Sequence, residues 1–256
     1  MCIVNFHFQD HPMYKLIVVA NRDEYYERPT KSAHFWEDEP NILAGRDLQQ
    51  KGTWLGISKE GRFAAITNYR DPSMPETGRY SRGEIIRKYL TRDIEPESFM
   101  NKLSKSRTNY GGYNIIFGDQ NRLFHYNNIL DESQIIDAGT HSVSNHSLNT
   151  PWPKVLKGKN NLQEYVQSHQ EKVHIDDLFQ IVADRSMAKD EELPHTGVGI
   201  QMERLLSPLF IKMENYGTRS STILLIDKED QVTFVERTFL DGEFQYDKQY
   251  KFSIGS

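Results

Sequence analysis

The sequence has 256 residues, of which 37% are hydrophobic, 11% aromatic and 26% charged, a balance typical of a soluble globular protein. The formal net charge of −5 gives no electrostatic reason to expect nucleic acid or an anionic membrane as a partner. No apolar run approaches the roughly 18 residues that span a bilayer, and the first residues lack the basic and apolar pattern of a signal peptide. We therefore expect no integral membrane segment.

Cys2 is the only cysteine in the sequence. A single cysteine forms no internal disulfide and no zinc or iron–sulfur site built on several cysteines, and it favours a reducing, cytoplasmic location. The nine histidines show no clear spacing of metal ligands, although His141 and His146 are five residues apart and His125 lies nearby. No phosphate-loop or dinucleotide-binding pattern occurs. We therefore expect neither a metal nor a cofactor.

The first third of the sequence is dominated by strand patterns. Residues 2–8 and 14–21 are β-branched and aromatic runs separated by turn-forming residues, which predicts a β-hairpin. The polar stretch that follows is closed by Pro29, and we expect a loop to begin near Asn21.

A second hairpin is predicted by residues 53–58 and 62–68. These two runs flank Lys-Glu-Gly, in which Gly61 is suited to a turn position with positive φ. Residues 70–83 are rich in Pro, Gly and Ser and predict a loop.

Helical periodicity predicts four helices, two in the middle of the chain and two further on. The predicted helices cover residues 82–93, 95–106, 150–170 and 174–186. In the first two, one helix face is marked by Ile85, Ile86, Tyr89 and Leu90, and then by Phe99 and Leu103. Pro96 suits the first turn of the second helix, and Thr150-Pro151 is the expected start of the third.

Further strand patterns lie between these helices and in the last third of the chain. They cover residues 113–119, 122–128, 133–137, 140–145, 219–227, 231–239 and 243–253. We expect the segments 133–137 and 140–145 to continue the sheet begun by the strands before them. No internal repeat or linker divides the chain, so we predict one α+β domain over residues 1–256, with antiparallel strands and outer helices.

Cys2 allows two interpretations. It can pack as a small hydrophobic residue at the start of a strand, which its position alone favours. Alternatively, removal of Met1 by methionine aminopeptidase gives Cys2 a free α-amine. This amine, with a pKa of about 8, can take the proton of the Cys2 thiol, whose ordinary pKa is about 8.5. Nucleophile and base would then belong to one residue.

Polar residues at the ends of other predicted strands are candidate partners of Cys2. Asp23 can accept a hydrogen bond from the ammonium or thiol, and Arg22 can stabilise a thiolate or a substrate carboxylate. Asn68 and Asn145 can supply side-chain amides to an oxyanion. Each also has a plainer interpretation, a solvated turn for the charged pair and ordinary turn formation for the asparagines.

Six blocks of the sequence carry a resemblance. They are MCIVNF (1–6), VANRDEYYERPT (19–30), AGRDLQQKGTWLGI (44–57), GRFAAITNYRDP (61–72), SNHSLNTPWPKV (144–155) and ENYGTRSSTILLID (214–227). In this order they resemble the NRDE family, also called the transport and Golgi organization protein 2 family, over essentially the whole chain. That family looks like a branch of the N-terminal nucleophile (Ntn) hydrolases of the choloylglycine hydrolase and penicillin V acylase type. The resemblance implies an α+β, Ntn-hydrolase-like four-layer αββα sandwich with two mostly antiparallel sheets and Cys2 at the tip of an inner strand.

The resemblance also implies roles for five residues. Cys2 would be both nucleophile and base, and Asp23 would orient it. Asn68 and Asn145 would donate to the oxyanion, and Arg219 would be the later arginine of the site, although a surface charge is its plainer interpretation.

One position departs from the acylase pattern of Arg-x-x-Asp. Ala20 occupies the arginine position here, and Arg22 directly precedes Asp23. Successive residues of a strand point to opposite faces, so Arg22 and Asp23 would not both reach Cys2 if the strand continued this far.

Two functions remain open from the sequence. The first is an N-terminal-cysteine amidase or acylase that hydrolyses a linear C–N amide or related acyl bond, with Arg22, Trp54 and Tyr69 as candidate substrate contacts. The second is a binding or carrier protein that holds a lipid-like or other hydrophobic ligand without turnover. A scaffolding role has no motif to support it.

Overall fold

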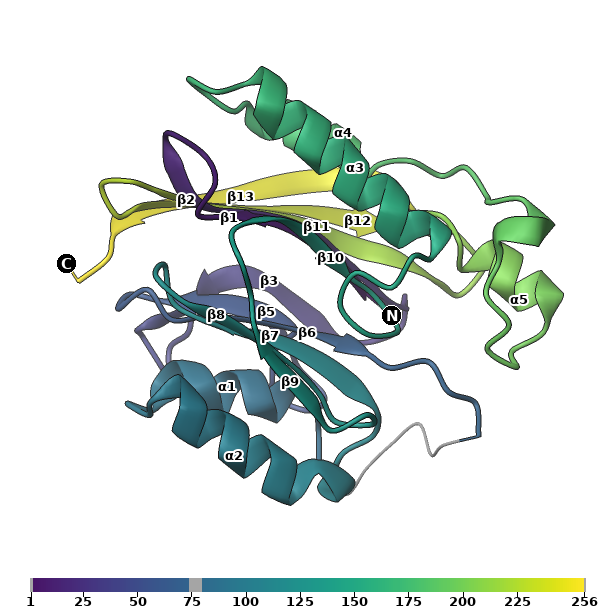
Figure 1. Cartoon of the computed structure of the whole chain (residues 1–256), viewed down its shortest axis with the longest axis horizontal. Coiled ribbons are helices and arrows are strands. Elements are labelled where there is room, and N and C mark those ends of the chain that lie inside the picture. Colours follow the sequence, from purple (N-terminus) through teal and green to yellow (C-terminus); the bar gives the residue numbers. More distant parts are fainter. Residues whose placement is uncertain (1, 74–79, 256) are drawn as a thin grey trace.

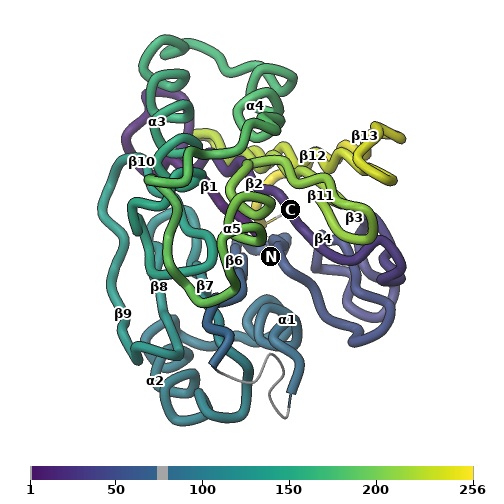
Figure 2. The backbone as a smooth tube through the Cα atoms, turned by 90° about the vertical axis from the view of Figure 1, so that its right-hand side faces the viewer, coloured from purple at the N-terminus to yellow at the C-terminus, as the bar shows by residue number. Residues whose placement is uncertain are grey.

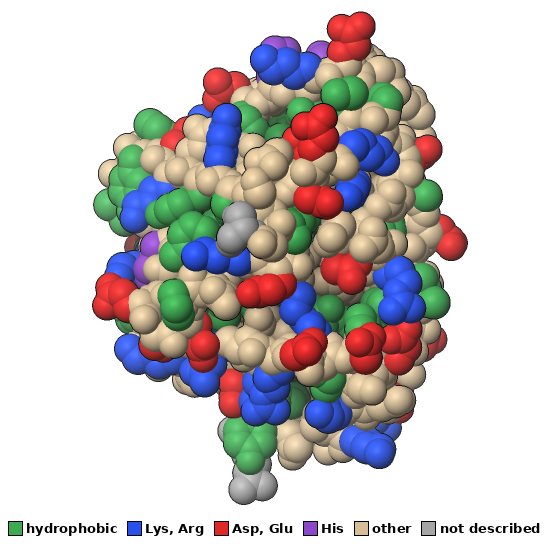
Figure 3. All heavy atoms as spheres, turned by 90° about the vertical axis from the view of Figure 1, so that its left-hand side faces the viewer, with side chains coloured by type: hydrophobic (Ala, Val, Ile, Leu, Met, Phe, Trp, Pro, Cys, Tyr) green, Lys and Arg blue, Asp and Glu red, His purple; other side chains and the backbone are tan. Residues whose placement is uncertain are grey.

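The structure is a computed structural model and describes residues 2–73 and 80–255. Two antiparallel sheets face each other, and helices cover the outer face of each, which makes four layers (Figure 1). On the face seen in Figure 3, acidic and basic side chains are interspersed, so this face presents no field of one sign. No helix of the described residues is long and apolar enough to cross a bilayer.

The first sheet has six strands. In spatial order they are β10 (Gly139–Val143), β1 (Cys2–Phe8), β2 (Tyr14–Tyr25), β11 (Tyr216–Asp227), β12 (Gln231–Leu240) and β13 (Glu243–Ser253). Helices α3 (Pro153–Ser168) and α4 (Ile175–Ile181) cover the outer face of this sheet (Figure 1).

The second sheet has seven strands. In spatial order they are β3 (Thr30–Phe35), β4 (Ile42–Asp47), β5 (Leu55–Ser58), β6 (Phe63–Asn68), β7 (Tyr113–Gly118), β8 (Leu123–Asn127) and β9 (Glu132–Ile135). Helices α1 (Gly83–Thr91) and α2 (Pro96–Ser106) cover its outer face. The short elements are α5 (Ile200–Leu205) and two 3₁₀ turns, Arg107–Asn109 and Asp190–Glu192.

Strand alternation explains how these sequences fill the layers. Along β1 and β2, Val4 and Val18 pack between the sheets, while Ile17 and Val19 face α3 and α4. Because both faces are covered at the centre of the first sheet, residues 16–20 of β2 and 223–226 of β11 are apolar runs. Strand β1 instead alternates, with the buried Asn5 and His7 on the face opposite to Val4 and Phe6. The first predicted hairpin is confirmed, with Cys2 opposite Arg22 at its open end.

The second hairpin and the helix faces are also confirmed. Strands β5 and β6 pair, and Gly61 has φ +84° in the turn between them. All six apolar positions marked on the first two helices are buried against the second sheet. Of the predicted loop 70–83, residues 74–79 lie outside the described residues.

Three expectations are wrong in detail. The loop expected near Asn21 does not form there. Instead β2 runs to Tyr25, because β11 pairs with it to that point and the Asn21 amide donates to the buried carbonyls of Val182 and Leu209. The strands predicted over 133–137 and 140–145 do not continue one sheet. β9 ends the second sheet, whereas β10 crosses to pair with the open edge of β1.

The third helix begins later than predicted. Its first residue is Pro153 and not Thr150, and Trp152 caps it in an extended conformation with φ −74° and ψ 149°. The proline ring disfavours the α conformation for the residue before it, which explains why the helix cannot start earlier.

Candidate functional site

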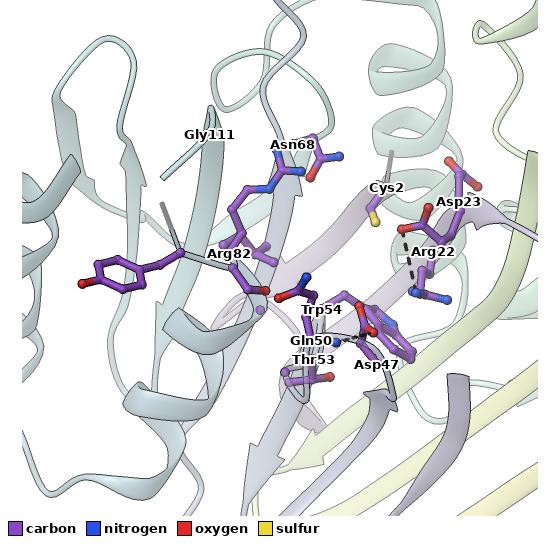
Figure 4. Close-up of a pocket in the computed structure, with 16 residues that line it drawn as sticks. Cys2, Arg22, Asp23, Asp47, Gln50, Thr53, Trp54, Asn68, Arg82 and Gly111 are labelled. Carbon is purple, nitrogen blue, oxygen red and sulfur yellow. Dashed lines mark hydrogen bonds and ion pairs between the residues drawn. The ribbon is translucent and has the colours of Figure 1, made fainter. Parts of the chain in front are cut away.

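Strands β1, β2 and β6 lie together above α1 at one end of the sandwich (Figure 2). Residues from these elements line a cavity of about 270 Å³. Cys2 directs its sulfur into this cavity, with Asn68 on one side and Arg22 and Asp23 on the other (Figure 4). The remaining described residues that line it are Glu24, Asp47, Gln50, Gly52, Thr53, Trp54, Ile66, Tyr80, Ser81, Arg82, Gly83 and Gly111. The cavity therefore joins residues of both sheets with the start of α1.

The Cys2 thiol is held against the backbone of β2. The backbone N–H of Asp23 donates to its sulfur, an interaction that favours the thiolate. Burial nevertheless raises the pKa of the Cys2 thiol, and the charge of Asp23 raises it further, while Arg22 opposes both. The thiol is therefore protonated at neutral pH and needs a base before it can attack.

Asp23 is fixed from the neighbouring strand β11. Its Oδ1 accepts a hydrogen bond of 2.7 Å from Thr218, and its backbone carbonyl accepts one of 3.0 Å from the Tyr216 hydroxyl. Burial raises the pKa of Asp23, and the charges of Lys154 and Arg22 and the Thr218 hydrogen bond oppose this rise. The carboxylate is thus held rigidly beside Cys2.

Arg22 is buried over an aromatic ring of the facing sheet. Its guanidinium lies 4.2 Å from the Trp54 ring centroid and donates to Thr30 Oγ1 at 3.1 Å. Strand alternation directs Arg22 and Asp23 to opposite faces of the first sheet, yet both line the cavity because it lies at the end of the strand.

The two asparagines occupy different places. Asn68 lines the cavity, whereas the Asn145 side chain is wholly buried and is not among the described cavity residues. Asn145 Nδ2 donates to the Asn68 backbone carbonyl at 2.9 Å, and Asn145 Oδ1 accepts from Lys154 Nζ at 3.1 Å and from the Ser144 hydroxyl at 3.0 Å. Asn145 therefore links the end of β6 to the start of α3.

Arg219 and Tyr69 also lie outside the cavity lining within the described residues. Arg219 is skipped in the β2–β11 register and donates to the backbone carbonyls of Tyr25 and Arg28 at 2.9 and 3.0 Å. Tyr69 packs its ring against His146, with centroids 5.0 Å apart. The roles expected for Arg219 and Tyr69 stay predictions.

Lys154 is a neighbour of the site that the sequence analysis missed. It lies in the block 144–155 that carries the resemblance, but lysine is normally a surface residue and nothing in the pattern marks it as buried. Burial, and then the charge of Arg70, lower the pKa of Lys154 to about 7, against the opposing charges of Asp23, Cys2 and Glu203. Arg70 and Glu203 form a buried ion pair at 2.6 Å.

His125, His141 and His146 each make a side-chain hydrogen bond. His125 is buried beside Asn114, and burial lowers its pKa to about 4. Across residues 2–73 and 80–255, no group of three or more His, Cys, Asp or Glu side chains is placed to hold a metal ion.

Two solved structures share this architecture. A mutant of the conjugated bile acid hydrolase from Clostridium perfringens aligns over 99% of this chain and 97% of that chain, with a TM-score of 0.55 and 7% sequence identity. A second variant of that hydrolase aligns over 99% and 98%, with a TM-score of 0.53 and 8% identity. The fold is an Ntn-hydrolase-like four-layer αββα sandwich, as the resemblance implied.

The sequence matches are closer than the structural ones. The family model for Transport and Golgi organisation 2 matches residues 1–241. The human Transport and Golgi organization protein 2 homolog is 34% identical over 278 residues, covering 100% of both chains. Transport and Golgi organization protein 2 of Drosophila melanogaster is 28% identical over 281 residues, covering 98% of this chain and 97% of the relative. The chain belongs to the Transport and Golgi organisation 2 family.

Proposed function

We propose that this chain is an N-terminal-cysteine hydrolase that cleaves a linear C–N amide or related acyl bond through an acyl-enzyme on Cys2. The observation that carries the proposal is the placement of Cys2 in the cavity, with Asp23 beside it and Asn68 across from it. The solved neighbours with the same fold are named as hydrolases of conjugated bile acids, which supports the reaction class.

The first half of the reaction forms a thioester. Once Met1 is removed, the α-amine of Cys2 takes the thiol proton, and Sγ attacks the carbonyl carbon of the substrate. The carbonyl oxygen becomes an oxyanion that accepts a hydrogen bond from the Asn68 amide. The C–N bond then breaks, and the leaving amine receives the proton held by the Cys2 ammonium. Asp23 keeps that ammonium in place.

The second half releases the acid. Water attacks the thioester carbonyl and gives a proton to the Cys2 α-amine, and the C–S bond breaks as this proton returns to sulfur. In this scheme Asn145 acts through Asn68, whose backbone carbonyl it holds. Arg219 supports the residues that follow β2 through the carbonyls of Tyr25 and Arg28.

The cavity lining favours a small polar substrate. A volume of about 270 Å³ is at the lower end for small-molecule sites, and the lining contains several charged side chains. Arg22, stacked on Trp54, can bind a substrate carboxylate, as the sequence suggested. A carrier of a lipid-like ligand would need a larger and more apolar cavity, so turnover is the better supported function.

We include in this proposal a cellular location and a domain organisation. A reducing, cytoplasmic location would keep the Cys2 thiol free, and residues 1–256 would act as one domain.

Intact mass and acyl trapping test the proposal together. The protein from cells is first weighed, and retention of Met1 would end this mechanism. The processed protein is then treated with p-nitrophenyl acetate, and we expect one acetyl group on Cys2 that is later hydrolysed, with an initial burst of p-nitrophenol.

Two controls define the result. Cys2→Ala should take up no acetyl group. Protein made with methionine aminopeptidase inhibited keeps the thiol but not the free Cys2 amine, and it should acylate far more slowly. Equal acylation of Cys2→Ala and wild type would contradict the proposal.

A further inference from the structure

Lys154 is a buried lysine behind the cavity, and the mechanism proposed above gives it no part. It is the second residue of α3 and is 3% exposed. Both features are unfavourable for an ammonium group, because burial removes its hydration and the first turn of a helix carries partial positive charge. The groups that stabilise a buried lysine at this position must therefore be sought among the neighbours of Lys154.

The titratable groups around Lys154 come from four other parts of the chain. They are Cys2 on β1, Asp23 on β2, Arg70 after β6 and Glu203 on α5. Glu203 already pairs with Arg70 at 2.6 Å, and Asp23 is the carboxylate whose charge raises the pKa of Lys154 most. Arg22 also opposes the rise in the pKa of Asp23, so the Asp23 carboxyl lies near two side-chain cations.

Lys154 also helps to fix the orientation of one side-chain amide, together with Ser144 and Arg70, which donate to the same oxygen. Its Nζ donates to Asn145 Oδ1 at 3.1 Å, which leaves Asn145 Nδ2 to donate to the Asn68 carbonyl at 2.9 Å. Since an amide presents its oxygen on one side and its nitrogen on the other, fixing the oxygen fixes the bond to Asn68.

We propose that Lys154 is a positioning residue of the Cys2 site, whose ammonium orients the Asn145 amide and balances the Asp23 carboxylate. This inference rests on the proposed function, in which Asp23 and Asn68 both act on Cys2. Lys154 touches no reacting atom in this scheme. It acts through Asn145 on the end of β6 and through Asp23 on the nucleophile.

A pH dependence follows from this arrangement. Lys154 has a pKa of about 7, so its ammonium is present below neutrality and is lost as the pH rises above it. Without the ammonium, Asp23 and a Cys2 thiolate are two negative charges with less compensation, and the thiol ionises less readily. The ionisations of Lys154 and Cys2 are therefore coupled, and the reactivity of Cys2 depends on both.

Alkylation of Cys2 by iodoacetamide tests this coupling without an acyl substrate. Cys2 is the only cysteine, so each alkylation reports on this thiol. The rate is measured between about pH 5 and pH 10 for the wild type, Lys154→Met and Lys154→Gln. Gln keeps a hydrogen-bond donor for Asn145 but lacks the charge. The matched control is Lys157→Met, an exposed lysine on the same helix.

We expect both Lys154 variants to be alkylated about tenfold more slowly than the wild type at pH 7, which corresponds to a rise of about one unit in the thiol pKa. Lys157→Met should match the wild type. The wild-type profile itself should show two ionisations, one of them near pH 7 and absent from the variants.

Unchanged alkylation rates in the Lys154 variants would overturn the inference. If circular dichroism shows that neither variant folds, the pH dependence of the wild-type alkylation rate is the test. A profile with a single ionisation would then overturn the inference. The outcomes are separable from those of the proposed function. If Cys2 is not acetylated but its alkylation slows in the Lys154 variants, only the proposed hydrolase is refuted. If Cys2 is acetylated but its alkylation rate is the same in the Lys154 variants, only the role of Lys154 is refuted.

Discussion

Lys154 and Glu236 are buried ionisable side chains in two different regions of the molecule. Lys154 lies on the helix side of the first sheet, behind the cavity, and Glu236 lies on β12, in contact with β3 of the second sheet. Burial is the main cause of both pKa shifts, but it lowers the pKa of Lys154 to about 7 and raises that of Glu236 to about 7. Burial disfavours the charged form in each case, which explains the opposite directions.

The hydrogen-bond partner of Glu236 is a backbone group, and the charges of Arg22 and Lys248 also favour its ionised form. The β3–β4 register skips from Lys31 to His34, which leaves Ala33 without a partner in the ladder. The Ala33 N–H donates to Glu236 Oε1 at 2.6 Å, and its carbonyl accepts from the Tyr250 hydroxyl at 2.8 Å. Side chains of the first sheet thus satisfy the backbone polar groups of Ala33 where the ladder of the second sheet is irregular, which is a structural role.

The partners of Lys154 belong instead to the candidate site. Asn145 accepts its hydrogen bond, and Asp23 balances its charge. The comparison teaches that burial and a pKa near 7 do not by themselves identify a functional group. A functional group is recognised by the residues that it contacts. Four substitutions probe the difference between the surroundings of Lys154 and those of Glu236.

Lys154→Met is expected to have the largest effect. The pKa of Lys154 is depressed on folding from 10.5 to about 7, so the unfolded chain binds its proton more tightly across this window. The free energy of unfolding of the wild type should therefore rise with pH between 7 and 10.5, by about 5 kcal/mol relative to Lys154→Met. Urea unfolding at a series of pH values measures this difference, and a pH-independent difference would contradict it.

Glu236→Gln should show the opposite slope. The pKa of Glu236 is raised on folding from 4.5 to about 7, so the stability that its protonated form contributes is lost as the pH rises through this range. The wild type should lose about 3 kcal/mol between pH 4.5 and 7 relative to Glu236→Gln, in which the amide oxygen still accepts from Ala33. The same urea series checks this, and an upward slope would refute the assignment.

Asp23→Asn tests the carboxylate that lies near Lys154 and Cys2. The amide keeps the shape of the side chain but loses the charge that holds the Cys2 ammonium and balances Lys154. We expect acetylation of Cys2 to slow by about 100-fold, typical of losing one such group in proton transfer. Single-turnover acetylation measures the rate, with Asp176→Asn, an exposed carboxylate over the same sheet, as the control. An equal slowing in both variants would argue against a specific role.

Much of the fold was predictable from short-range patterns. The first hairpin, the Gly61 turn and the apolar faces of α1 and α2 follow from periodicity and turn chemistry, which act over a few residues. The family blocks also led to Cys2 and Asn68, which meet in the cavity.

The rest depended on contacts between distant segments. Asn21 is polar, and a local sequence pattern therefore indicates a loop there. The carbonyl groups that accept its hydrogen bonds inside the fold lie more than 160 residues away in the sequence, so the pattern cannot include them. Lys154 and Glu236 carry charges that a sequence pattern assigns to the surface, and only the packing of α3 on the site and of β12 on β3 buries them. Arg219 donates to backbone carbonyls where the β2–β11 register is irregular, an interaction that the sequence pattern did not indicate, and its role in the site stays a prediction.

Tyr250→Phe should have the smallest effect and gives the sharpest contrast. It removes only the hydroxyl that donates to the Ala33 carbonyl, a single neutral hydrogen bond worth about 1 kcal/mol. Because no buried charge changes, the loss of stability should be the same at every pH below the titration of tyrosine. Acetylation and alkylation of Cys2 should stay at wild-type rates. Urea unfolding and both labelling assays check these outcomes. Slower labelling would mean that the contact between β12, β13 and β3 also supports the cavity, and the two regions would then not be independent.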